Sequence, residues 1–124
     1  MKQLEAEVIA SMRTALEHLD TDHAVVREQM YKAHDLFGDH LMEWSEAFGT
    51  LYNGMLEIFR AHTPMPTGQY RVSHVGIGYS SFPVTTWVAD TEQPVPPTAI
   101  ELVARFDVLI HAWSARSARS EQVA

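Results

Sequence analysis

Apolar residues in the first half of the chain recur at steps of three and four, the spacing typical of an amphipathic helix. At about 100° per residue they fall in one sector roughly 100° wide, and most acidic residues gather on the opposite side. The pattern predicts helix over about residues 2–62, with one face in a core. The apolar positions are Leu4, Val8, Met12, Ala15, Leu19, Val26, Met30, Ala33, Phe37, Leu41, Trp44, Phe48, Leu51, Met55 and Phe59.

Two interpretations of this stretch remain open, one long helix or a helical hairpin. The apolar stripe keeps its phase across Asp20-Thr21-Asp22, as an unbroken helix would. These residues are poor in a helix interior, by roughly 0.6 kcal/mol each against Ala, and good at N-caps, so a hairpin would break there. Typical helix lengths favour the hairpin. Glycines offer further breaks, with Asn53-Gly54 the first candidate.

A second lane of glycine and large apolar residues runs beside the main stripe. It suits close approach by another backbone, because glycine has no side chain and the large groups pack around it. The lane is covered either by the first and last helices of the same chain or by another subunit. Its members, the candidate interface residues, are Tyr31, Gly38, Met42, Gly49, Tyr52 and Leu56.

The middle of the chain holds all six prolines and changes its period. Residues 70–79 alternate, and residues 84–88 are rich in β-branched and aromatic side chains. This predicts a Pro-bounded two-stranded β-ribbon over about 70–89, with residues 80–83 as the connection. A two-stranded ribbon alone is marginal in water, so we expect it to lie on the helices or to be completed by a neighbouring chain.

A last helix is predicted over about 98–115. Thr98 and Glu101 have the spacing of a capping box, and a wide apolar face follows. The apolar pattern is lost from Ser114 onward, so residues 115–124 are expected to fray. The predicted fold class is mainly α (α+β), with residues 1–124 in a single domain.

Composition and charge exclude several classes of function. Lys and Arg number 9 against 16 Asp and Glu, and the net charge of −7 disfavours binding to nucleic acid or anionic membranes. The absence of cysteine excludes disulfides, thiolate metal sites and cysteine nucleophiles. The polar N-terminus lacks the features of a signal peptide, and no long apolar run occurs. We therefore expect a soluble, acidic, cytoplasmic protein that binds neither nucleic acid nor membrane.

The histidines and carboxylates do not have the spacing of metal ligands. No Glu-x-x-His and no His-x-x-x-His occurs, which a di-metal bundle or a helical zinc pair would need. The acidic group Asp35, Asp39, Glu43 and Glu46 is interpreted as a solvated helix face. We expect no bound metal and no cofactor.

For catalysis, the ribbon is the one region that pairs glycine-made space with polar and aromatic groups. His74 is the first candidate, with Arg71 and Tyr79 beside it and Trp87 and His111 as further members. The competing interpretation is that the glycines let the ribbon lie flush on a helix and His74 points at water. No Gly-x-Ser-x-Gly elbow or complete phosphate loop is present.

These observations favour a helical, non-catalytic accessory or assembly subunit. Its partner would be a second copy of itself, giving a homo-oligomer, or a larger protein, bound through apolar helix faces. One alternative is a small enzyme or ligand-binding protein with a pocket between ribbon and helices. A helical metal-binding protein is the other.

Overall fold

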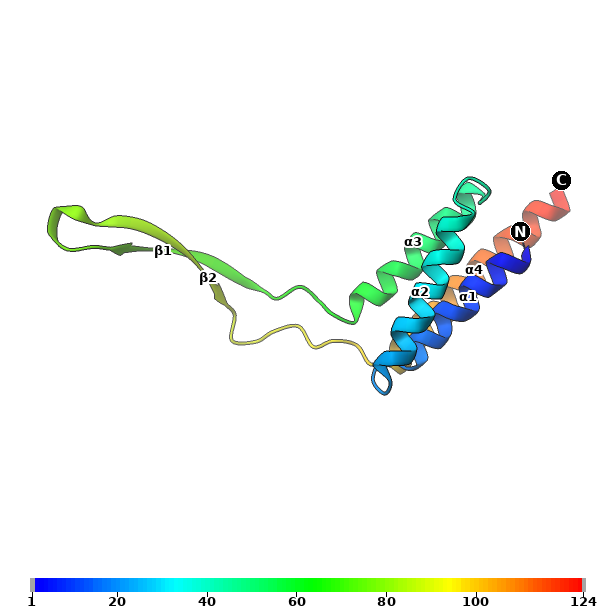
Figure 1. Ribbon diagram of the computed structural model, residues 1–124, viewed down its shortest axis with the longest axis horizontal. Coiled ribbons are helices and arrows are strands. Elements are labelled where there is room, and N and C mark those ends of the chain that lie inside the picture. Colours follow the sequence, from blue (N-terminus) through cyan, green and yellow to red (C-terminus); the bar gives the residue numbers. More distant parts are fainter. Residues whose placement is uncertain (1, 124) are drawn as a thin grey trace. The chain divides into compact units, whose positions relative to one another are not determined.

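The computed structural model describes the backbone of residues 2–123 and the side chains of residues 2–119. Its elements are α1 (Lys2–Glu17), α2 (His23–Asp39), α3 (Glu46–Ala61), β1 (Gly68–Val75), the 3-10 turn η1 (Gly78–Ser80), β2 (Phe82–Ala89) and α4 (Ala99–Val123) (Figure 1). The predicted fold class, mainly α with a small β-ribbon, is confirmed.

The chain divides into two compact units. The helical unit comprises residues up to Thr63 and from Pro97 onward, and the ribbon unit comprises Pro64–Pro96. The expectation that both fold as a single domain stays a prediction.

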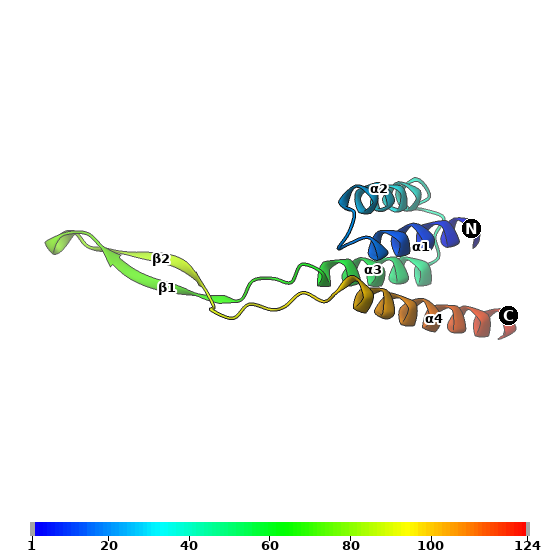
Figure 2. The same ribbon diagram turned by 90° about the horizontal axis from the view of Figure 1, so that it is seen from below.

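In the helical unit, α1 lies between α2 on one side and α3 and α4 on the other (Figure 2). Val8, Met12 and Ala15 of the predicted stripe are buried in α1, and Ser11 and Leu16, which lie outside that stripe, are buried as well. The buried sector of α1 is therefore wider than predicted, which fits its central position. Phe48 of α3 and Phe106 of α4 are fully buried and complete the core from the opposite side. The core residues are Val8, Met12, Ala15, Leu16, Leu19, Ala33, Phe48, Leu51, Tyr52, Met55, Ala99, Leu102 and Phe106.

The first break in the helices is the predicted hairpin. α1 ends at Glu17 and α2 begins at His23. Asp22 is the N-cap of α2, and its Oδ1 accepts hydrogen bonds from the backbone N–H groups of Ala24 at 3.1 Å and Val25 at 3.3 Å. The cap satisfies amides that would otherwise lack partners, which makes this the stable break point.

A second break lies between α2 and α3, just after Gly38, one of the glycines considered as a possible break. Asn53-Gly54 was the expected point and this was wrong, because both residues lie inside α3. The chain turns over residues 40–45 instead, where the Ser45 hydroxyl caps α3 by accepting from the Phe48 N–H at 3.1 Å. Trp44 returns to the core, its Nε1 donating to the Phe37 carbonyl at 2.7 Å. The apolar residues therefore keep their helical spacing through this turn, so the spacing alone did not reveal the break.

The start of α4 has the predicted capping box. The Thr98 hydroxyl accepts from the Glu101 N–H at 3.2 Å, and the Glu101 carboxylate accepts from the Thr98 N–H at 3.1 Å. The predicted end near residue 115 is wrong, since α4 runs to Val123. The Ala- and Arg-containing tail has lost its apolar pattern but contains no helix breaker. Fraying of residues 115–124 stays a prediction.

The ribbon unit is a two-stranded antiparallel sheet whose register runs from Gly68↔Ala89 to Val75↔Phe82. The predicted connection over residues 80–83 is corrected: the turn spans residues 76–81, and Phe82 and Pro83 belong to β2. The reversal occurs earlier because Gly76 (φ 142°) and Gly78 (φ 62°) adopt positive φ, which glycine tolerates best.

Candidate functional site

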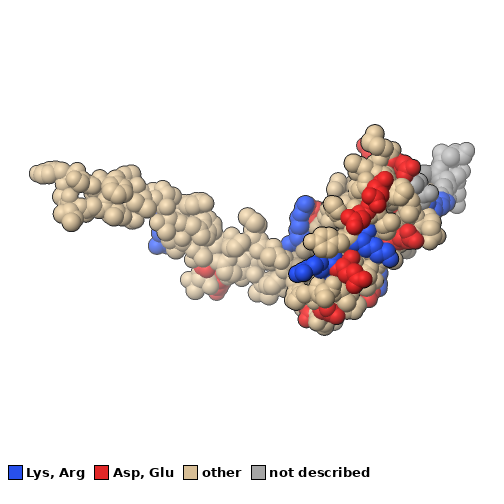
Figure 3. Space-filling model, viewed as in Figure 1, with Lys and Arg blue, Asp and Glu red and all other residues tan. Residues whose placement is uncertain are grey.

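The ribbon exposes apolar side chains on both faces and at its turn. Tyr70 and Val72 are 71% and 63% exposed on one face, and Phe82 is 57% exposed on the other. Arg71 is the one charged residue of the segment 68–89, and the ribbon is correspondingly almost free of red and blue in Figure 3. Exposed apolar side chains on both faces, with so little charge around them, are typical of a surface that another chain covers.

The register defines the two faces, because side chains alternate along a strand and direct partners share a face. One face carries Tyr70, Val72 and His74 with their partners on β2. Here the rings of Tyr70 and Trp87 meet edge to face, with centroids 5.1 Å apart. The other face carries Val75 and Phe82 as direct partners. This second face also carries the polar residues Gln69, Arg71, Ser73 and Thr86, whereas the polar residues of the first face are His74 and Thr85. Both faces therefore expose apolar side chains, and the first face is the more apolar of the two.

The hydrogen-bond pattern identifies the backbone groups on each outer edge. The Asp90 N–H donates to the Thr67 carbonyl at 2.9 Å, one step beyond Gly68↔Ala89 in the same register. Hydrogen-bonded and non-hydrogen-bonded pairs alternate in antiparallel sheets, so His74↔Pro83 is a non-hydrogen-bonded pair. The outward-facing residues of β1 are Gly68, Tyr70, Val72 and His74, and those of β2 are Pro83, Thr85, Trp87 and Ala89.

Gln93 fastens the base of the ribbon. Its Oε1 accepts from the Thr67 N–H at 2.9 Å, and its Nε2 donates to the carbonyls of Thr67 at 2.9 Å and Asp90 at 2.8 Å. The side-chain amide thus stands in for a backbone peptide at the end of the ladder. The ribbon therefore has a defined end opposite its turn, and its strand register is held from both ends.

The predicted catalytic group is not brought together on one surface of the ribbon. Arg71 and His74 are separated by an odd number of positions in β1, so their side chains leave opposite faces. Tyr79 lies in the turn and is fully exposed. Trp87 packs on Tyr70, and His111 is an exposed residue of α4. A catalytic role for His74, Arg71 and Tyr79 stays a prediction.

The predicted interface lane is divided between two helices by the break at residues 40–45. Tyr31 and Gly38 are exposed on α2, and Met42 is 94% exposed in the turn. Gly49 and Leu56 are partly buried on α3, where Tyr52 is buried and stacks on Phe37 with centroids 3.9 Å apart. Burial raises the pKa of the Tyr52 hydroxyl. An interface role for these residues stays a prediction, but they do not share one helical face.

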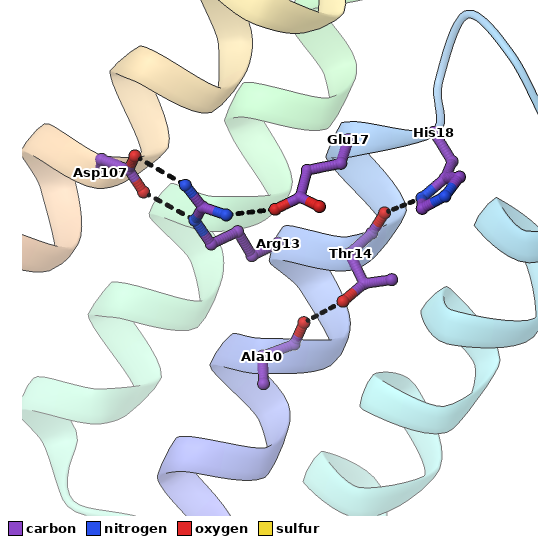
Figure 4. Close-up of polar contacts among 6 residues, drawn as sticks. All are labelled: Ala10, Arg13, Thr14, Glu17, His18 and Asp107. Carbon is purple, nitrogen blue, oxygen red and sulfur yellow. Dashed lines mark hydrogen bonds and ion pairs between the residues drawn. The ribbon is translucent and has the colours of Figure 1, made fainter.

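Arg13 joins α1 to α4 on the helical unit (Figure 4). Its Nε and Nη2 donate to the two carboxylate oxygens of Asp107 at 2.9 and 3.0 Å, and Nη1 bonds Glu17. The guanidinium lowers the pKa of Asp107 through hydrogen bonding. In the same view, the Thr14 hydroxyl donates to the Ala10 carbonyl and the His18 ring bonds the Thr14 carbonyl. The Arg13–Asp107 pair thus joins two helices, whereas the other contacts in this view are local to α1 and the turn that follows it.

Asp20 connects three segments that are far apart in sequence. Its Oδ2 accepts from the Ala99 N–H at 2.9 Å at the start of α4, and its Oδ1 bonds His62 Nε2 at 3.2 Å at the end of α3. The Ala99 hydrogen bond, followed by that of His62, lowers the pKa of Asp20. Sequence reasoning treated Asp20 only as a helix breaker, since nothing local indicates a partner 79 positions away.

The helical unit carries open grooves beside Trp113. The larger, of about 660 Å³, is lined by Glu46, Ala47, Thr50, Trp113, Arg116 and Ser117. Among the side chains of residues 2–119, no group of three or more His, Asp or Glu is placed to hold a metal ion. The described helices also include none with the length and apolar character needed to cross a membrane.

Comparison with protein-family models, curated proteins and solved structures finds no match for this chain. Its function is therefore argued from its own residues.

Proposed function

We propose that this chain is a non-catalytic assembly subunit that works as a homo-oligomer, with the ribbon as its binding surface. The observation that carries the proposal is the ribbon's exposed apolar surface, on both faces and at the turn, around a single charged residue. The class of function is the one expected from the sequence. The proposed binding surface is the ribbon and not the helix faces expected from the sequence, because the helices bury most of their apolar stripe against one another.

The distribution of charge supports a second copy as the partner. Of the net charge of −7, the ribbon unit carries −1, from Arg71 against Asp90 and Glu92, which leaves −6 for the helical unit. Two helical units would repel each other, whereas two ribbons approach without this cost. An acidic protein can thus associate with itself through its least charged segment, where apolar burial provides the driving force.

The test is the solution mass of the full chain at tens of micromolar, measured by light scattering. A matched pair of substitutions locates the surface: Val75→Lys places a charge on the ribbon, and Val108→Lys places the same charge on α4, where Val108 is 71% exposed against 51% for Val75. We expect a multiple of 14.0 kDa for the unmodified chain and for Val108→Lys, and the monomer mass for Val75→Lys.

Two results would contradict the proposal. A monomeric unmodified chain excludes self-association as the function. An oligomer that Val108→Lys dissociates and Val75→Lys leaves intact assigns the surface to the helices.

A further inference from the structure

The two outer edges of the ribbon differ in their ability to accept another strand. The β1 edge offers an N–H and a carbonyl at each of its outward-facing residues, Gly68, Tyr70, Val72 and His74. The β2 edge lacks the first of its donors, because Pro83 has no N–H and faces outward. Proline on an edge strand is a common way to stop further pairing. The β1 edge is therefore the one equipped to pair.

We infer that the β1 edge of one copy pairs antiparallel with the β1 edge of a second copy. This inference rests on the proposed function and specifies its contact. Across a two-fold axis the pairing is isologous and gives one four-stranded sheet in the order β2-β1-β1-β2. Pro83 then lies on both outer edges of that sheet, so the assembly closes as a dimer and does not extend into a fibre.

Strand geometry allows two registers with nearly full overlap. Outward-facing residues must oppose outward-facing residues, so either Arg71 opposes Arg71 of the second copy, or Val72 opposes Val72 of the second copy. The first register sets two guanidinium groups directly opposite each other, which is destabilising.

The second register avoids this repulsion. It sets Arg71 opposite Ser73 of the second copy, and Tyr70 opposite His74 of the second copy. Neither cross-strand pair sets two like charges opposite each other, and the tyrosine and histidine rings are direct neighbours on one face. Charge therefore selects the register centred on Val72.

Because the chain contains no cysteine, single cysteine variants test this register directly. In the selected register, the Cα atoms of Val72 and its symmetry mate are about 5.5 Å apart, within the range of a disulfide. We expect Val72→Cys to form a covalent dimer on mild oxidation of the full chain. Thr85→Cys is the matched control: Thr85 is the direct partner of Val72 in the ribbon but lies on the β2 edge. It should remain uncrosslinked.

Amide hydrogen exchange of the unmodified chain supplies a second readout that needs no substitution. Pairing through β1 protects the N–H of Val72 and leaves that of Thr85 exchanging, although both face outward in a single ribbon. We expect slower exchange at Val72 by at least tenfold, and loss of that protection on dilution to monomer.

The outcomes separate this inference from the proposed function. An oligomer that Val75→Lys dissociates, but in which Val72→Cys does not crosslink and Val72 is unprotected, overturns the β1 edge and keeps the assembly function. Crosslinking by Arg71→Cys in place of Val72→Cys overturns the register. A monomer by light scattering overturns both proposals.

Discussion

The helical unit and the ribbon unit place their apolar side chains in opposite ways. Phe106 of α4 is fully buried, while Phe82 of β2 is 57% exposed. The helical unit buries most of its apolar stripe within the chain and carries most of the charge outside, although Met42 and Val108 are exposed. The ribbon displays apolar groups and almost no charge. The comparison indicates that the first unit is built for its own stability and the second for contact with another chain.

The two units also differ in what holds them together. The helices share a core to which all four contribute, and Arg13 and Asp20 add links between distant segments. The ribbon relies on its backbone ladder, the Tyr70–Trp87 ring contact and the Gln93 amide. Isolated two-stranded ribbons are marginally stable, so association would stabilise this one by completing its sheet.

The sharpest test of the comparison uses two identical substitutions, one in each unit. Phe106→Ala removes a fully buried ring from the helical core and should cost about 3–5 kcal/mol of unfolding free energy. Phe82→Ala removes an exposed ring and should change the stability of the helices by less than about 0.5 kcal/mol. Denaturant unfolding followed by helical circular dichroism measures both.

The two substitutions should have the opposite order of effect on the solution mass of the chain. Phe82→Ala should weaken association. Phe106→Ala should leave association intact under conditions in which its destabilised helices are still folded. If Phe106→Ala also removes the dispersed amide signals of β1 and β2, the two units unfold together and the chain is a single cooperative domain. Equal losses of helix stability from both substitutions would contradict the view that the helical unit is stable by itself and that the ribbon serves contact with another chain.

A glycine substitution tests the ribbon alone. A Cβ on Gly76 would lie 2.6 Å from the Ser80 carbonyl oxygen, so Gly76→Ala forces the turn backbone to shift. A Cβ on Gly78 would have no atom within 4 Å. The cost of Gly78→Ala is therefore only that of placing alanine at a φ of 62°, roughly 1–2 kcal/mol of conformational free energy. We expect Gly76→Ala to reduce ribbon amide protection and association more than Gly78→Ala does.

Neither glycine substitution should change helical unfolding. Gly49→Ala on α3 is the control in the other unit: nothing lies within 4 Å of its added Cβ, so it should stabilise the helices by about 0.5–1 kcal/mol. A loss of helix stability from Gly76→Ala would show that ribbon and helices depend on each other.

How far the sequence predicted this fold depends on whether the signal was local. The helix caps formed by Asp22 and by Thr98 with Glu101 could be predicted because the residues involved are neighbours in sequence. The second break was placed first at Asn53-Gly54 and not at residues 40–45, because Trp44 turns back onto Phe37 and preserves the apolar spacing. The early turn at Gly76 was missed because alternation alone does not report where φ becomes positive.

The candidate surface was only partly predictable for the same reason. The composition and length of the ribbon predicted that it needs support, from the helices or from a neighbouring chain, and which of the two supplies it stays a prediction. The difference between its two edges did not, because it depends on the strand register that places Pro83 opposite His74. The Asp20 contacts with Ala99 and His62 likewise depend on tertiary packing.

The smallest predicted effect concerns acid and the helical unit. The pKa of Asp20 is lowered by the Ala99 N–H and by His62, so the unfolded chain binds this proton more readily than the folded chain. The carboxylate's contribution to stability is then complete above the ordinary pKa, about 3.8–3.9, and is lost as the pH falls through the lower folded value.

Asp20→Asn should therefore melt at a lower temperature than the unmodified chain near pH 6, and the difference should shrink below pH 4. Glu28→Gln, an exposed carboxylate of α2, is the control and should give a smaller difference at pH 6. Thermal melts followed by circular dichroism between pH 2 and 7 measure this; a difference that grows below pH 4 would mean that Asp20 does not stabilise the helices as a carboxylate.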